Sequence, residues 1–172
     1  AEDIEPDYPN LQQLIADMFE TMYHSEGVGL AAPQINKSIR LFVIDADPFH
    51  ENYPEAKGFK KVFINPEIVE VSDETWTFNE GCLSLPDMHE DVVRPSKITI
   101  NYLDENFVEH EEEYDGICAR VIQHEYDHLE GKVYVDRVAP MRKMMLKNKL
   151  RNISEGNVYV DYKMIFPNKR RR

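Results

Sequence analysis

The segment ICARVIQHEYDHLEG, residues 117–131, constrains this chain more than any other. Its apolar residues recur at helical spacing and Gly131 stands where a helix would end, so the segment predicts an α-helix. His124 and His128 are four residues apart and therefore share one face of that helix. The apolar stripe of the helix continues onto these two histidines. Two imidazoles in this position can bind one divalent metal ion without bending the backbone.

Glu125 stands at the edge of the face that carries the two histidines, about 100° around the helix from His124. Its carboxylate can reach a water molecule held by the ion without itself binding the ion, which is the H-E-x-x-H arrangement of two ligands and a general base. Histidines at this spacing also occur by chance on solvated helices. Here they extend a buried stripe, where imidazoles need partners, and this favours metal binding.

A catalytic metal site of this kind needs a third protein ligand. Cys82, in the segment EGCLSLP at 80–86, is the best candidate, because Gly81 beside it allows close approach of the backbone and a thiolate is a strong, soft ligand for iron(II) or zinc. The competing interpretation is that Cys82 is a small buried hydrophobe, as a lone cysteine commonly is. Cys118 lies on another helix face and is assigned to the core. We expect only surface or local hydrogen-bonding roles for the remaining histidines, which are His24, His50, His89 and His110.

Other patterns predict the remaining elements. Apolar residues at helical spacing predict a helix over 11–24, with Asn10 as its N-cap and Gln13 completing a capping box. The segment GVGLAAPQI at 27–35 is too apolar for a solvated loop. A basic amphipathic helix is predicted over 140–152. Strands are predicted at 39–45 and at 62–78, the second with breaks at 65–66 and 72–73. Segments 97–103 and 107–114 predict a hairpin whose acidic second strand is a solvated edge. A short β segment at 133–138 and a terminal strand at 158–166 complete the predicted strands.

Composition excludes several classes of protein. The chain has 172 residues, with 20 Lys and Arg against 32 Asp and Glu, so its formal charge of −12 argues against binding DNA over a broad face. Two cysteines cannot build a disulfide scaffold, and no apolar run is long enough to span a membrane. We expect one α+β domain over 1–172, with further residues before Ala1 and a frayed basic tail at 169–172.

Three segments in order, GVGLAAPQ at 27–34, EGCLS at 80–84 and QHEYDH at 123–128, resemble the signature motifs of peptide deformylase. The resemblance covers roughly residues 1–140 and leaves 140–172 as a variable segment. It implies an α+β fold with small, mostly antiparallel sheets around a central metal-binding helix. It also implies removal of the N-formyl group from the formyl-methionine of newly made polypeptides, with release of formate.

The resemblance assigns a role to each matching position. Cys82, His124 and His128 would hold one divalent ion, iron(II) in cells, with zinc, nickel or cobalt as replacements. Glu125 would be the general acid and base, and the Gln34 side chain with the Leu83 N–H would stabilise the oxyanion. The backbone of Val28 and Gly29 would pair with the substrate peptide. The pocket for the methionine side chain would be formed by Phe78, Ile117 and Val121 with the His124 ring. A supporting ion pair of Glu80 with Arg94 is a further hypothesis.

Partners and location follow from the same resemblance. The substrates would be nascent chains in the bacterial cytoplasm near the ribosomal exit tunnel, and we expect a monomer. The basic helix at 140–152 could contact ribosomal RNA, although packing against the rest of the chain is the simpler interpretation. Two other functions remain open: an H-E-x-x-H peptidase that cuts internal peptide bonds, and a binding module that uses a metal only for stability. A cysteine ligand is unusual in the first, and the second has no use for Glu125.

Overall fold

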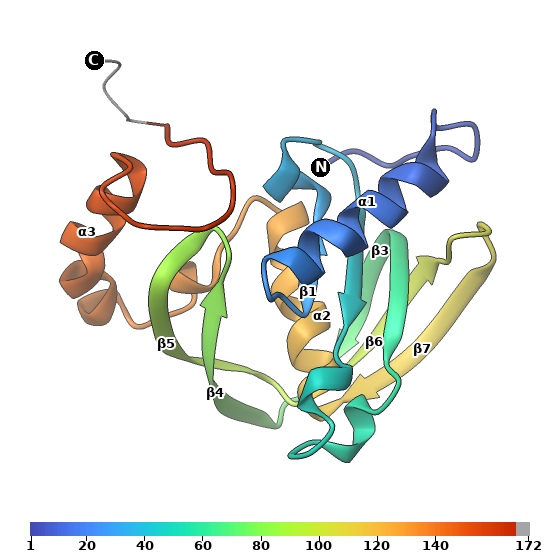
Figure 1. Cartoon of the computed structure of the whole chain (residues 1–172). Coiled ribbons are helices and arrows are strands. Elements are labelled where there is room, and N and C mark those ends of the chain that lie inside the picture. The colour runs from blue at the N-terminus through green and yellow to red at the C-terminus, as the bar shows by residue number, and fades with distance from the viewer. Residues whose placement is uncertain (168–172) are drawn as a thin grey trace. The chain divides into compact units, whose positions relative to one another are not determined.

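A computed structural model of the chain describes residues 1–167, so the tail predicted at 169–172 lies outside the described residues. The fold is α+β with two antiparallel sheets, as expected (Figure 1). None of the described helices is long and apolar enough to cross a membrane. The helices and strands are α1 Leu11–His24, β1 Gly29–Ala31, β2 Leu41–Asp45, β3 Lys60–Val71, β4 Thr75–Cys82, β5 Leu85–Pro95, β6 Lys97–Leu103, β7 Glu109–Asp115, α2 Gly116–Leu129 and α3 Pro140–Ser154, with 3-10 turns at Ala32–Ile35, Asp47–Phe49, Pro54–Ala56 and Tyr134–Asp136.

The elements gather into two compact units. The sheet unit comprises residues 1–76 and 94–133, and the hairpin unit comprises residues 77–93 and, within the described part of the chain, 134–167. The sheet unit holds a five-stranded antiparallel sheet in the order β1-β2-β3-β6-β7. Residues Leu41–Ile44 of β2 are fully buried, which requires cover on both faces of the strand, and both α1 and α2 pack against it.

β3 continues through the first of the two breaks that its sequence predicts. Asn65 has a positive φ of 47°, and the register with β6 shifts between Ile64 and Glu67, so the Asn-Pro pair forms a bulge instead of ending the strand. The second predicted break is real, because β3 ends at Val71. The predicted hairpin of β6 and β7 is also confirmed, and β7 is an edge of the sheet.

The N-terminal cap predicted for α1 is wrong, although the helix itself has the predicted bounds. Asn10 adopts a left-handed conformation with φ 54° and makes no side-chain cap hydrogen bond. The side chain of Gln13 instead donates to Asp17 at 2.7 Å. The tight turn before the helix therefore uses Asn10 for its backbone conformation, a role that asparagine tolerates well.

The hairpin unit contains most of β4 and β5, the turn Leu83–Ser84 that joins them, and α3. Two predicted strands are wrong here: 133–138 contains the 3-10 turn Tyr134–Asp136, and 158–166 is irregular. Alternation in sequence makes a strand only where a neighbouring strand offers hydrogen-bond partners. The helix predicted over 140–152 is confirmed as α3, but the amphipathic character predicted for it is not, because only Leu146 and Ile153 are buried on it and its three methionines are exposed.

Candidate metal centre and active site

Both ends of α2 are fixed by specific contacts. At its start, Gly116 has a φ of 53° and the Glu55 carboxylate accepts the Ile117 N–H at 3.2 Å. At its end, Lys132 N–H donates to the Asp127 carbonyl at 2.8 Å and Gly131 N–H to the His128 carbonyl at 3.2 Å, which is a Schellman motif. The helix therefore presents its middle residues from a rigid frame.

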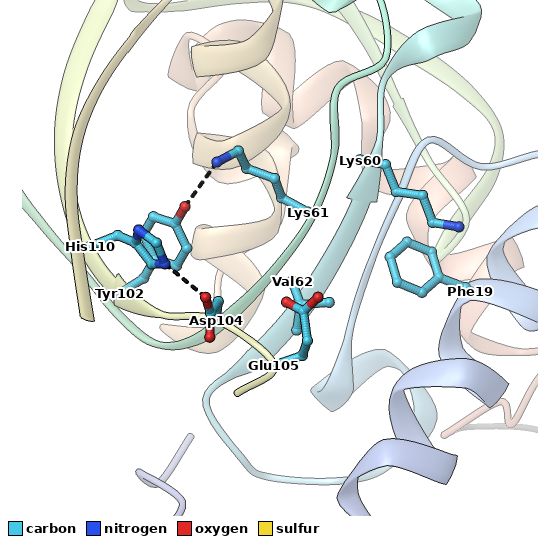
Figure 2. Close-up of a pocket in the computed structure, with 8 residues that line it drawn as sticks. All are labelled: Phe19, Lys60, Lys61, Val62, Tyr102, Asp104, Glu105 and His110. Atoms are coloured by element: carbon cyan, nitrogen blue, oxygen red, sulfur yellow. Dashed lines mark hydrogen bonds and ion pairs between the residues drawn. The ribbon is translucent and has the colours of Figure 1, made fainter. Parts of the chain in front are cut away.

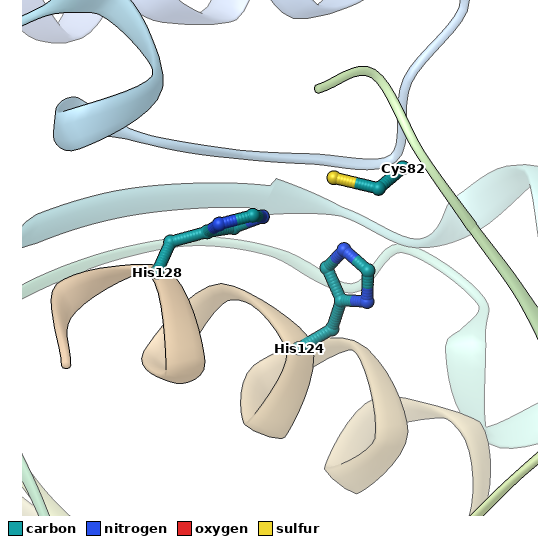
Figure 3. A group of neighbouring side chains, drawn as sticks. All are labelled: Cys82, His124 and His128. Carbon is teal, nitrogen blue, oxygen red and sulfur yellow. The ribbon is translucent and has the colours of Figure 1, made fainter. Parts of the chain in front are cut away.

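The two histidines of α2 are neighbours, as their spacing predicts. Their ring centroids are 5.2 Å apart and the ring planes are inclined by 77°. One potential ligand atom from each of Cys82, His124 and His128 lies within 4.8 Å of the others (Figure 3). A thiolate and two imidazoles are donors that both zinc and iron(II) accept, so the chemistry of this set fits a divalent ion.

Glu125 is buried and lies against β1 of the sheet unit. A Cβ at Gly29 would stand only 2.4 Å from Glu125 Oε1, so no larger residue fits there unless the carboxylate moves. The glycine predicted to contact substrate thus also makes room for the predicted acid and base. Val28, beside it, accepts the Asp45 N–H through its carbonyl at 2.9 Å.

The side-chain amide of Gln34 has a defined orientation. Its Oε1 accepts the Ala31 N–H at 2.9 Å, so the NH₂ end of the amide must point away from Ala31. Leu83 lies in the two-residue turn between β4 and β5. Of the three residues predicted for the methionine pocket, Ile117 and Val121 are buried and Phe78 is partly exposed.

Asp127 has a role that the sequence reasoning missed. Its Oδ2 pairs with Arg94 Nη1 at 2.7 Å, and both side chains are almost wholly buried. Arg94 was expected to pair with Glu80, which is also buried, and that pair stays a prediction. The signal for Asp127 was its position one residue before His128 in a buried helix, where a carboxylate needs a cationic partner.

Gly81 allows a close approach, as predicted, and the group that approaches is a histidine. A Cβ at Gly81 would lie 2.6 Å from His89 Nε2. The imidazole of His89 therefore packs against the residue that precedes Cys82. Cys118 is buried, as predicted, and burial raises the pKa of its thiol to about 11.

A hollow of about 320 Å³ occurs within the sheet unit, and none of the predicted site residues lines it (Figure 2). Four of its polar side chains are bonded in pairs, with Lys61 Nζ 3.1 Å from the Tyr102 hydroxyl and His110 Nε2 2.8 Å from Asp104 Oδ2. We therefore do not assign the reaction to it. The lining residues are Phe19, Lys60, Lys61, Val62, Tyr102, Asp104, Glu105 and His110.

Comparison with known proteins matches residues 1–144 to the family described as polypeptide deformylase. The peptide deformylase of Christiangramia forsetii is 51% identical, over 98% of this chain and 89% of the relative, and that of Flavobacterium johnsoniae is 52% identical, over 95% and 87%. Among solved structures, a peptide deformylase from Legionella pneumophila has 41% identity and a TM-score of 0.76, covering 91% of this chain and 88% of its own. One from Plasmodium falciparum has 35% identity and a TM-score of 0.80, covering 94% and 92%.

These matches extend over nearly the whole chain and include all three motif segments. The relatives share both the sequence and the fold, and the chain carries a possible Cys-His-His metal site of the kind that a metal-dependent hydrolase needs. The chain therefore belongs to the polypeptide deformylase family of metal-dependent hydrolases.

Proposed function

We propose that the chain hydrolyses the formamide of N-formylmethionyl nascent peptides and releases formate. The observation that carries this proposal is the cluster of Cys82, His124 and His128, with Glu125 next to His124 on the same helix, in a chain of this family. A formyl carbon bears only hydrogen, so a tight site can accept it and exclude bulkier acyl groups.

Cys82, His124 and His128 would hold one divalent cation. We propose iron(II) in cells, with zinc, nickel or cobalt able to replace it. When bound, the cation would act as a Lewis acid and lower the pKa of a water molecule. With one anionic and two neutral ligands, it would do so less strongly than with three neutral ones, which makes a protein base more necessary.

Glu125 is that base in our proposal. Its carboxylate takes a proton from the attacking water as the oxygen bonds to the formyl carbon, and then gives the proton to the departing amine nitrogen as the C–N bond breaks. Its burial beside Gly29 supports this role, because the carboxylate can occupy only a small range of positions.

The negative charge that develops on the formyl oxygen would be met by two donors, the Gln34 amide and the Leu83 N–H. The bond from Ala31 N–H to Gln34 Oε1 supports the first assignment, because it leaves the NH₂ end of the amide as the part directed elsewhere. A donor of this kind typically contributes about 2.7–4 kcal/mol to transition-state stabilisation.

The substrate backbone would add to β1, which is the edge of the five-stranded sheet opposite β7. Val28 and Gly29 would pair with it, since an extended peptide can add one strand at the edge of a sheet. The methionine side chain would enter a pocket formed by Phe78, Ile117 and Val121. The apolar character of all three residues supports this assignment.

Mass spectrometry of reactions with formyl-Met-Ala-Ser and acetyl-Met-Ala-Ser tests the reaction itself. We expect formate from the first peptide only. Internal fragments would instead identify a peptidase, and no turnover of either peptide by the metal-loaded protein would contradict the proposal.

Substitution of the base tests the mechanism. Glu125→Gln should retain the metal and lower kcat by about 10²–10⁴, the usual contribution of a general base. Glu130→Gln, a change at the exposed end of the same helix, should retain full activity and serves as the control. Unchanged turnover in Glu125→Gln would show that Glu125 is not the general base.

We also propose that the chain acts as one catalytic domain and as a monomer, on polypeptides leaving the ribosome in the bacterial cytoplasm. The exposed basic side chains of α3 support a contact with ribosomal RNA, since only Leu146 and Ile153 of this helix are buried. Replacing Lys147 and Lys149 with glutamate should reduce co-sedimentation with ribosomes without changing turnover of a short peptide. Equal co-sedimentation would dismiss the contact.

A further inference from the structure

The turn between β4 and β5 is tied to the C-terminal segment of the chain. The carbonyl of Leu83 accepts a hydrogen bond of 2.7 Å from the hydroxyl of Tyr162, which lies 79 residues further along. This irregular segment passes over the tip of the β4–β5 hairpin (Figure 1). Turn residues lie outside the ladder of strand hydrogen bonds, so a bond to their backbone restricts atoms that the sheet itself leaves less constrained.

Two further contacts join the chain after Tyr134 to β5. The hydroxyl of Tyr134 donates to the Met88 carbonyl at 3.0 Å in a buried position. Arg142 makes two bonds to the Glu90 carboxylate, at 2.5 and 2.8 Å. These contacts anchor the middle of β5, whereas Tyr162 reaches the turn itself, directly after Cys82.

The hydroxyl of Tyr162 is suited to act as a donor. The residue is half-buried, and burial is the largest cause that raises the pKa of its hydroxyl above the ordinary value of 10.0. The hydroxyl is therefore protonated at neutral pH and can donate to Leu83.

We propose that Tyr162 is a positioning residue for the oxyanion donor, and this inference rests on the function proposed above. The Leu83 carbonyl lies in the peptide plane that follows Leu83, so holding it restricts the φ and ψ rotations through which the preceding plane, with the Leu83 N–H, can reorient. The N–H must meet the developing charge at about 2.7–3.1 Å, so small displacements of the turn reduce its effect. The C-terminal segment, which lies beyond the matched family region at 1–144, thereby acts on the chemistry.

The test compares Tyr162→Phe with Tyr159→Phe in the full, metal-loaded chain. Both changes remove one hydroxyl from the same segment, but Tyr159 is 86% exposed and serves as the matched control. We expect Tyr162→Phe to lower kcat for formyl-Met-Ala-Ser about three- to tenfold, the effect of losing one neutral hydrogen bond, with little change in KM. Metal content and melting temperature should match those of the control.

Amide hydrogen exchange supplies a readout that does not depend on activity. In Tyr162→Phe, exchange at the Leu83 and Ser84 amides should become about three- to tenfold faster, while exchange in the middle of β4 and β5 stays as in Tyr159→Phe. Faster exchange together with a lower kcat supports the proposal. Unchanged exchange, or faster exchange with the kcat of the control, overturns it.

The two proposals fail in different ways. If the unsubstituted chain releases no formate, the proposed function fails and the role of Tyr162 in it fails too, whatever exchange shows about the turn. If the unsubstituted chain is active and Tyr162→Phe behaves as Tyr159→Phe, the positioning role alone is wrong. A fall in melting temperature with normal kcat in the folded protein would show that Tyr162 is merely structural.

Discussion

The helices α2 and α3 have nearly equal lengths, 14 and 15 residues, but they are held in different ways. Eleven residues of α2 are buried, among them charged side chains such as Glu125 and Asp127, whereas α3 buries only two. α3 instead relies on polar contacts near its start, such as Arg142 with Glu90. The comparison shows that a helix bearing reactive groups is fixed by packing on most sides, and that buried charge on it requires built-in partners.

The largest test of this difference compares a buried ion pair with an exposed one. Arg94→Ala leaves Asp127 on α2 buried without its guanidinium, which should lower the free energy of unfolding by about 3–5 kcal/mol. Lys143→Ala on α3 breaks an exposed pair with Asp136 and should cost about 1 kcal/mol or less. Urea denaturation followed by circular dichroism measures both, and equal losses would break the comparison.

A double substitution sharpens that result. Arg94→Met combined with Asp127→Leu replaces both charges with apolar side chains, and such replacements are often neutral or stabilising. The double variant should therefore recover much of the loss seen in Arg94→Ala. If it does not, the pair contributes a specific geometry that apolar packing cannot replace.

The next largest effect on the free energy of unfolding is expected from shortening an apolar side chain. Ile122 on α2 is fully buried, so Ile122→Ala should lower the free energy of unfolding by about 2–5 kcal/mol. Met144 on α3 is 77% exposed, and Met144→Ala should change the same quantity by about 0.5 kcal/mol or less. A large loss in the second variant would show that α3 is covered in solution by something beyond this chain.

The two cysteines test how accessible a buried side chain of α2 is compared with a side chain at the end of β4. In metal-free protein near neutral pH, iodoacetamide should label Cys82 at least about tenfold faster than Cys118, because Cys118 is buried and burial raises its pKa to about 11. Adding zinc should protect Cys82, which peptide mapping would reveal. Labelling of Cys82 that zinc leaves unchanged would remove it from the proposed ligand set.

Sequence patterns correctly predicted the features that depend only on residues close together in the chain. The bounds of α1 and most of α2 follow from apolar spacing, and the proximity of His124 to His128 follows from the helix repeat. Cys82 lies far from them in the chain, and only the resemblance of its EGCLS segment linked it firmly to the histidines. Its closeness to the ring nitrogens is a property of the folded chain.

The structural features that the sequence did not predict correctly were missed for physical reasons. β5 was not recognised as a strand because its buried face carries Pro86, Glu90 and Arg94 along with apolar residues, so the usual alternation of apolar and polar residues is hidden. The segment 158–166 alternates well but pairs with no strand among the described residues. The bond from Tyr162 to Leu83 could not have been foreseen, since nothing local to either residue specifies it.

The smallest expected effect concerns Glu112, whose carboxylate is neither as buried as those of α2 nor as exposed as most side chains of α3. Glu112 on β7 is partly buried, which by itself raises its pKa, but hydrogen bonds from Tyr114, Tyr102 and Lys61 outweigh burial and hold the pKa below its ordinary 4.5. A carboxylate with a depressed folded pKa stabilises the fold above its unfolded pKa and loses that contribution as the pH falls through the folded value. Glu112→Gln should therefore cost about 1 kcal/mol or less near neutral pH. The difference in melting temperature from the unsubstituted chain should shrink as the pH falls below 4.5, and a difference that instead widens in acid would show that the ionised carboxylate contributes nothing to stability.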